Sequence, residues 1–126
     1  MTGTNLYAAW IGILLGCLAG AGTGLFFRGE DWLGGYGSWS RRMLRLGHIS
    51  FFGIAFINIA FALTARSLNV ETEVGVSSAL LLVGAAAMPS VCYLSSVRDT
   101  FRHLFFVPTL SVIAGVALFL WTAFLR

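Results

Sequence analysis

Long blocks of apolar residues, rather than an alternation of apolar and polar positions, dominate this chain. A helix needs about 20 apolar residues, at about 1.5 Å each, to cross the roughly 30 Å of hydrocarbon in a bilayer. Four blocks reach that length, at about 6–27, 46–65, 76–97 and 104–125. The pattern therefore predicts an all-α integral membrane protein with four transmembrane helices in an up-down bundle.

The segments between these blocks are short, and the longest of them covers residues 28–45. They leave no room for a soluble domain, so residues 1–126 are expected to form a single membrane domain. Within the longest segment, the glycine-rich stretch GEDWLGGYGSWS predicts an irregular loop at the membrane surface. Ser40 at its end is a candidate N-cap for the helix that continues into the second block.

The composition agrees with a membrane protein and argues against a soluble enzyme. Hydrophobic residues make up 58% of the chain and charged residues 10%, whereas soluble domains contain about 25% charged residues. The sequence has no nucleophile–base pair, phosphate-binding loop or zinc-ligand spacing, so catalysis by this chain alone is not expected. Its net charge of +3 needs no nucleic acid to explain it, because arginine near a membrane also marks topology.

The arginines fall mostly in two segments, which sets the expected orientation. These are the segments that join the first to the second block and the third to the fourth: they hold Arg28, Arg41, Arg42, Arg45, Arg98 and Arg102. Short arginine-rich loops stay in the cytoplasm. Both termini are therefore expected on the non-cytoplasmic side of the cell inner (plasma) membrane, in a multi-pass protein that contacts membrane lipid.

A row of small residues runs along the first block. Gly12, Gly16, Gly20 and Gly24 recur at every fourth position, which places them on one face of a helix, as in a glycine zipper. Such a face lets another helix approach closely. The partner can be the second block, a second copy of the chain, or another integral membrane subunit.

The only two histidines share one sequence setting. His48 lies in RRMLRLGHISFF and His103 in RDTFRHLFF, each after an arginine and before a phenylalanine pair. They begin the second and fourth blocks, so the predicted topology places both near the cytoplasmic surface. We expect them in the same leaflet, with Arg45 and Arg102 close by.

Three interpretations of this pair remain open. In the first, both rings lie at headgroup depth and bind only backbone or water, with no cofactor. In the second, His48 and His103 are axial ligands of a haem or chlorophyll-type tetrapyrrole, with Arg45 and Arg102 on its carboxylates. In the third, the two histidines bind copper together with Met88 and Cys92, whose sulfur atoms suit that metal.

These features favour an accessory role in the membrane. We expect a small integral subunit of a larger membrane complex, concerned with electron transfer or energy conversion and holding a haem or chlorin through its histidines. The alternatives are a structural or assembly subunit without a cofactor, which packs helices and lipid, and a small homo-oligomeric channel or transporter. No acidic residue lies inside the four blocks, although proton-coupled transport normally uses one there.

Overall fold

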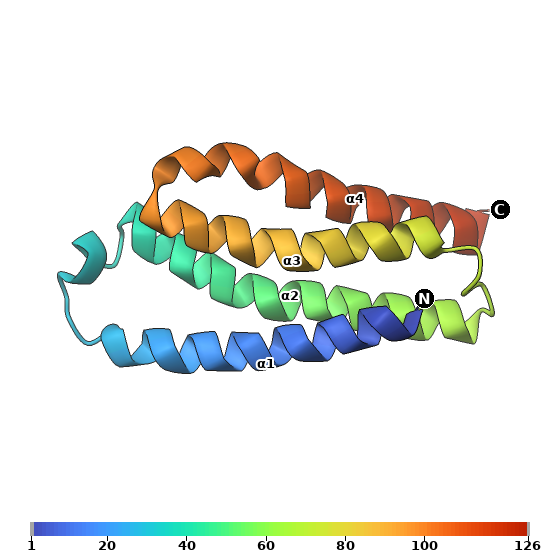
Figure 1. Cartoon of the computed structure of the whole chain (residues 1–126), viewed down its shortest axis with the longest axis horizontal. Helices are drawn as coiled ribbons and strands as arrows, with labels where there is room; N and C mark the ends of the chain where they lie inside the picture. The colour runs from blue at the N-terminus through green and yellow to red at the C-terminus, as the bar shows by residue number, and fades with distance from the viewer. Residues whose placement is uncertain (1, 126) are drawn as a thin grey trace.

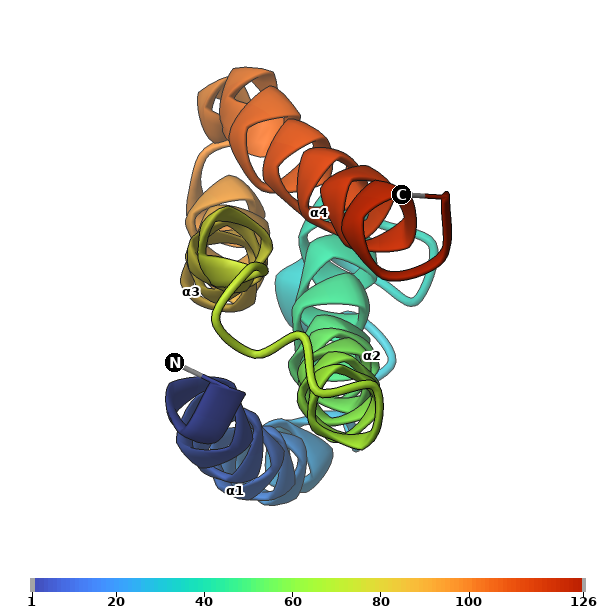
Figure 2. The same ribbon diagram turned by 90° about the vertical axis from the view of Figure 1, so that its right-hand side faces the viewer.

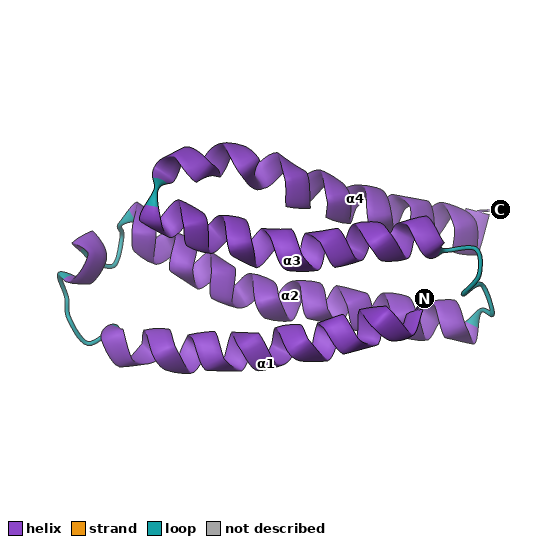
Figure 3. Cartoon of the chain, viewed as in Figure 1, coloured by secondary structure: helices purple, strands orange, loops and turns teal. Residues whose placement is uncertain are grey.

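The computed structural model describes residues 2–125, and within them all regular structure is helical (Figures 1 and 3). The four long helices are α1 (Thr2–Phe26), α2 (Trp39–Ser67), α3 (Gly75–Val97) and α4 (Phe106–Leu120). With the short helices that flank α4, all four are long and apolar enough to cross a membrane. The predicted all-α class and the four membrane-length helices are therefore confirmed.

Consecutive helices run in opposite directions, so both termini lie at one end of the bundle (Figure 1). We call this the terminal end, and the opposite end, which carries the 27–38 loop, the arginine end. Helices α2 and α3 pack against each other at the centre, α1 packs on α2, and α4 packs on α3. Helices α1 and α4 consequently lie on opposite sides of the central pair (Figure 2).

Helix α2 begins at Trp39, before the apolar block that predicted it. The side chain of Ser38 accepts a hydrogen bond from the backbone N–H of Arg41 at 3.2 Å, and this bond caps the first turn. The prediction that Ser40 caps the helix was wrong, because Ser40 already lies within the first turn. The apolar block marks the part of a helix that suits hydrocarbon, whereas the capping residue marks where the helix starts.

The fourth apolar block is divided among three helical geometries. A 3₁₀ helix, η2 (Asp99–Phe105), precedes α4, and a π-helical turn, η3 (Trp121–Leu125), follows it. Pro108 lies in the first turn of α4 and has no backbone N–H, so it cannot donate to the carbonyl of Leu104. This missing hydrogen bond favours the tighter 3₁₀ geometry before α4, which begins at Phe106 rather than at the predicted residue 104.

The apolar core lies toward the terminal end, where α2, α3 and α4 meet. Phe61, Val74 and Leu81 are almost completely buried there. The ring of Phe61 packs edge-to-face on that of Phe119, with centroids 4.9 Å apart, a favourable aromatic geometry. This contact brings α4 against α2 at the terminal end.

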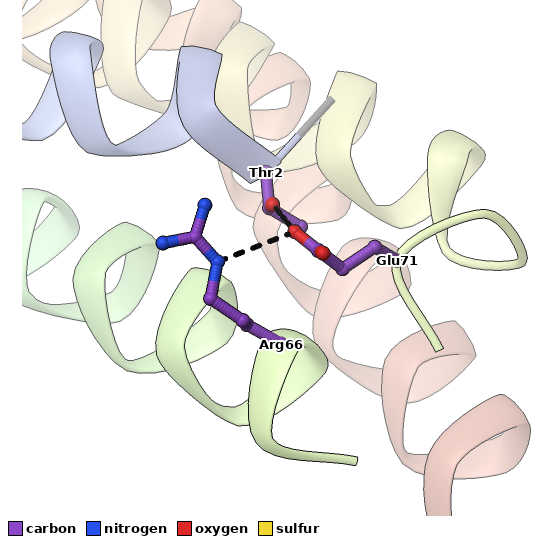
Figure 4. Close-up of polar contacts among 3 residues, drawn as sticks. All are labelled: Thr2, Arg66 and Glu71. Atoms are coloured by element: carbon purple, nitrogen blue, oxygen red, sulfur yellow. Dashed lines mark hydrogen bonds and ion pairs between the residues drawn. The ribbon is translucent and has the colours of Figure 1, made fainter. Parts of the chain in front are cut away.

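A polar contact attaches the start of α1 to the loop between α2 and α3 (Figure 4). The hydroxyl of Thr2 donates a hydrogen bond to the carboxylate of Glu71. Arg66, at the end of α2, places its Nε 3.7 Å from the same carboxylate oxygen. Because Arg66 is largely exposed and Glu71 is partly exposed, this ion pair contributes little, about 0–1 kcal/mol.

Candidate functional site

The two halves of the bundle differ in whether their buried polar side chains have hydrogen-bond partners. In the terminal half, Asn5 of α1, Asn58 of α2 and Ser78 of α3 are almost completely buried and joined by hydrogen bonds. Asn5 Nδ2 donates to Asn58 Oδ1 at 2.7 Å, and the Ser78 hydroxyl donates to Asn5 Oδ1 at 2.5 Å. Asn58 Nδ2 also donates to the carbonyl of Ile54 at 2.9 Å. This network connects three helices and leaves its polar atoms satisfied.

In the arginine half, three buried polar atoms have no hydrogen-bond partner within residues 2–125. They are Nδ1 of His48, the hydroxyl oxygen of Tyr93 and Oγ of Ser95. Native proteins bond the large majority of buried polar side-chain atoms, so an unbonded one calls for a specific reason such as a functional role. Of these three residues, His48 is also one of the ligands predicted from the sequence.

The ring of His48 is fixed by a glycine of α1 and an aromatic ring of its own helix. A Cβ built on Gly20 would lie only 2.4 Å from His48 Cε1, so α1 can pass this ring only because residue 20 is glycine. Phe52, one turn later on α2, packs edge-to-face on the imidazole, with centroids 5.3 Å apart. These two contacts set the orientation of the ring and keep Nδ1 enclosed.

A small hollow lies beside this imidazole, between α1 and α2. Its volume is about 170 Å³, and its lining consists of Gly20, Thr23, Gly24, Phe27, Leu44, Arg45 and His48. A Cβ built on Gly24 would meet no atom within 4 Å, so the α1 side of the hollow is open there. The Thr23 hydroxyl donates to the carbonyl of Ala19, and its oxygen can still accept a hydrogen bond.

Arg45 borders this hollow, but part of its side chain already has a role in the 27–38 loop. Its Nη1 donates to the carbonyl of Tyr36 at 3.1 Å, and its guanidinium lies 4.1 Å from the centroid of the Tyr36 ring. A guanidinium has five N–H donors, so this contact leaves others free for an anionic group. The structure thus places Arg45 with His48, as the sequence suggested.

The structure does not place His103 and Arg102 in this site. Both are exposed on η2, which packs on α3 and α4. His48 instead faces α1, on the opposite side of the central helices (Figure 2). The two histidines share the arginine end of the bundle, but one chain does not bring them to a common ligand.

The sulfur-bearing residues do not join His48 either. Cys92 is 0% exposed and packs between α3 and α2, where a Cβ on Gly47 would lie 3.1 Å from its own Cβ. Met88 is half-buried one turn earlier on α3. Within the described residues, no group of three or more His, Cys, Asp and Glu side chains is arranged to hold a metal ion.

The glycine row of α1 faces α2 over most of its length. A Cβ on Gly12 would contact the carbonyl oxygen of Phe51 at 3.5 Å, and one on Gly16 would lie 2.9 Å from the Phe52 ring. Gly20 meets His48, as described above, whereas Gly24 meets nothing. Three of the four glycines therefore pack against α2, whereas Gly24 does not.

Arg41 has a structural role that the sequence reading missed. Only 3% of it is exposed, and its guanidinium donates to the carbonyls of Trp32 and Gly29. The same group lies 5.3 Å and 5.5 Å from the ring centroids of Phe27 and Trp32. Arg41 therefore holds the 27–38 loop on the start of α2. The only sequence signal of this role was the pair of aromatic residues in the loop, Phe27 and Trp32.

Comparison with known proteins gives no family for this chain: no family model, no curated protein and no solved structure matches it. Of the sequence-predicted site residues, only His48 combines a fixed ring, an adjoining hollow and a neighbouring arginine.

Proposed function

We propose that this chain is a small integral subunit of a larger membrane complex, in which His48 supplies an axial nitrogen to a haem or chlorophyll-type tetrapyrrole. The complex is of the electron-transfer or energy-converting kind. The chain crosses the cell inner (plasma) membrane four times, with its arginine end on the cytoplasmic side, because arginine-rich short loops are retained there. The electron chemistry belongs to the bound cofactor, while the protein fixes its orientation and surroundings.

The geometry of the His48 ring is the observation that carries this proposal. Nδ1 is enclosed by protein and has no hydrogen-bond partner within residues 2–125, so we assign the metal-binding role to Nε2. Gly20 and Phe52 both contact the ring, so this nitrogen has a fixed direction, as an axial ligand requires. Neutral imidazole is the common axial ligand of haem iron, and helical bundles build such sites from facing side chains.

The size of the hollow explains why we propose a subunit rather than an independent cofactor carrier. Its 170 Å³ lies below the roughly 300–1,000 Å³ of pockets that enclose a ligand of drug size. A tetrapyrrole would therefore place one edge against Gly24 and Arg45 and leave the rest outside this chain. Helices of another subunit would have to cover the remaining surface and supply any second axial ligand.

Arg45 is suited to hold the acidic side groups of such a cofactor. Haem carries propionate carboxylates, and a guanidinium pairs with a carboxylate through two parallel hydrogen bonds. The contact of Arg45 with Tyr36 orients its side chain at the rim of the hollow. His103 and Arg102 have no part in this version of the site, because both are exposed on η2.

The test is purification of the tagged chain from its own membranes in mild detergent, with mass spectrometry of the co-purifying proteins and absorption spectroscopy of the complex. We expect a tetrapyrrole band that is lost in His48→Ala and retained in His103→Ala. The second variant is the matched control, because it removes the other histidine at the same end of the bundle. Equal loss in both variants, or a bound tetrapyrrole that neither affects, would contradict the His48 assignment.

A structural subunit without a cofactor is the second candidate, and the Asn5–Asn58–Ser78 network favours it. Fully bonded polar clusters between membrane helices hold those helices together and specify their arrangement. Under this interpretation the chain acts only through its packing surfaces. It predicts that the complex assembles normally in His48→Ala and never carries a band that depends on that residue.

A further inference from the structure

A long groove lies in the apolar surface of the bundle, separate from the His48 site. It has a volume of about 570 Å³ and lies between α1 and α3, with α2 as its floor. Ala8 and Leu15 mark its extent on α1, and Leu82 and Tyr93 mark its extent on α3. Its walls are mostly aliphatic and include the small side chains of Ala85 and Ala86.

The length and the apolar lining of this groove suit a hydrocarbon chain. From Leu82 to Tyr93 it is about 16 Å long, at about 1.5 Å per helical residue. One flexible hydrocarbon chain can lie along a groove of this length and apolar lining.

The groove is closed at the terminal end and leads toward the arginine end. At the closed end, Asn5 of α1 donates a hydrogen bond to the carbonyl of Ser78 of α3 at 3.3 Å, which joins the two walls. Its length of about 16 Å matches one leaflet, half of the roughly 30 Å of bilayer hydrocarbon. A chain that enters from the arginine end therefore stops near the middle of the bilayer.

The arginine end carries positive charge at headgroup depth. Arg98 follows the last residue of α3 and lies about 7.5 Å along the helix from Tyr93, at the outer part of the polar layer, which extends about 5–7.5 Å beyond the hydrocarbon. Arg28, Arg42, Arg98 and Arg102 are exposed, and within residues 2–125 their side chains form no hydrogen bond or ion pair. Such a surface attracts anionic lipid headgroups.

We propose that this groove binds one anionic phospholipid of the arginine-side leaflet, with an acyl chain between α1 and α3 and the phosphate near Arg98. The proposal shares with the His48 proposal only the membrane-spanning arrangement, and either can fail without the other. The bound lipid would fill the space between α1 and α3.

The test is native mass spectrometry of the delipidated full chain, incubated with equal amounts of dioleoyl phosphatidylglycerol and dioleoyl phosphatidylcholine. We expect one phospholipid per chain, with phosphatidylglycerol preferred about fivefold if a single arginine contributes as it does near an anionic surface. Ala86→Leu fills the groove from an exposed position and should remove the lipid. Ala79→Leu, also exposed on α3 but outside the groove, should keep it.

Arg98→Gln distinguishes binding of the acyl chain from recognition of the headgroup. The variant should still bind one phospholipid but lose most of the preference for phosphatidylglycerol. Far-UV circular dichroism checks that Ala86→Leu folds, and Ala85→Val serves as a second variant that narrows the groove. Equal lipid retention in the wild type and both groove variants would overturn the proposal. So would an isoprenoid quinone as the native occupant, a dimer formed through this face, or a chain that binds no lipid.

Discussion

The imidazole of His48 lies so close to Gly20 that a single added methyl group on α1 would fall 2.4 Å from its Cε1 atom. This contact joins two features that looked independent in the sequence, the histidine of the second apolar block and the glycine row of the first. It also decides the direction of the histidine, which faces α1 rather than α3 or α4. The position of the candidate cofactor site follows from that direction.

The first prediction concerns this contact. Gly20→Ala places its Cβ against the His48 ring and should lower the free energy of unfolding by about 1–3 kcal/mol, the usual cost of overpacking. Gly24→Ala is the matched control: its Cβ meets nothing, so it should be neutral or stabilise the helix by up to about 1 kcal/mol. Thermal or denaturant unfolding in detergent measures both.

Removing the histidine should relieve the effect of Gly20→Ala. In the double variant with His48→Ala, the alanine at position 20 faces a smaller side chain, so most of its cost should disappear. If instead Gly20→Ala and Gly24→Ala unfold alike, the close approach of α1 to His48 is not present in the folded protein.

The buried network of the terminal half supports a second prediction. Asn5→Leu removes the partner of Asn58 Oδ1 and of the Ser78 hydroxyl while keeping a side chain of similar size. Buried polar atoms left without a partner should reduce stability by about 1–3 kcal/mol. Ser90→Ala is the control, because that exposed hydroxyl bonds only the carbonyl of Ala86 in its own helix. A change of about 0.5 kcal/mol or less is expected there.

The third prediction tests Arg41 as the residue that holds the 27–38 loop. Arg41→Lys keeps the positive charge but loses the planar group that bonds two carbonyls and packs on two aromatic rings. Hydrogen exchange of the loop amides should accelerate by about tenfold or more, since a hydrogen bond to a charged group contributes about 1.5–3 kcal/mol. Arg42→Lys changes an exposed arginine and should leave the exchange rates unaltered. Equal rates in both variants would show that Arg41 does not fix the loop.

Much of the fold could be predicted from the sequence, because crossing a bilayer imposes one strong requirement, about 20 apolar residues per helix. The ends of the helices were less predictable. Ser38, not Ser40, caps α2, and the 3₁₀ segment before Pro108 shifts the start of α4. These depend on single hydrogen bonds at positions where apolar and polar residues mix.

The site was only partly predictable for a different reason. The apolar blocks predict the depth of a residue in the membrane but not which neighbouring helix the residue faces. His48 and His103 do share one end of the bundle, yet the rotation of α2 directs His48 toward α1, and η2 carries His103 to the far side of α3. The number of arginines in a loop likewise predicts its side of the membrane but does not distinguish the buried Arg41 from the exposed Arg42.

The most direct measurement of the central claim is chemical rescue of the complex by imidazole. His48→Gly should lose the tetrapyrrole absorption band, and free imidazole added to the purified complex should restore it by occupying the space of the missing ring. An axial ligand can be replaced in this way. An absorption band that is unchanged in His48→Gly would contradict ligation by His48. So would a band that is lost in both His48→Gly and His103→Gly and that imidazole restores in neither variant.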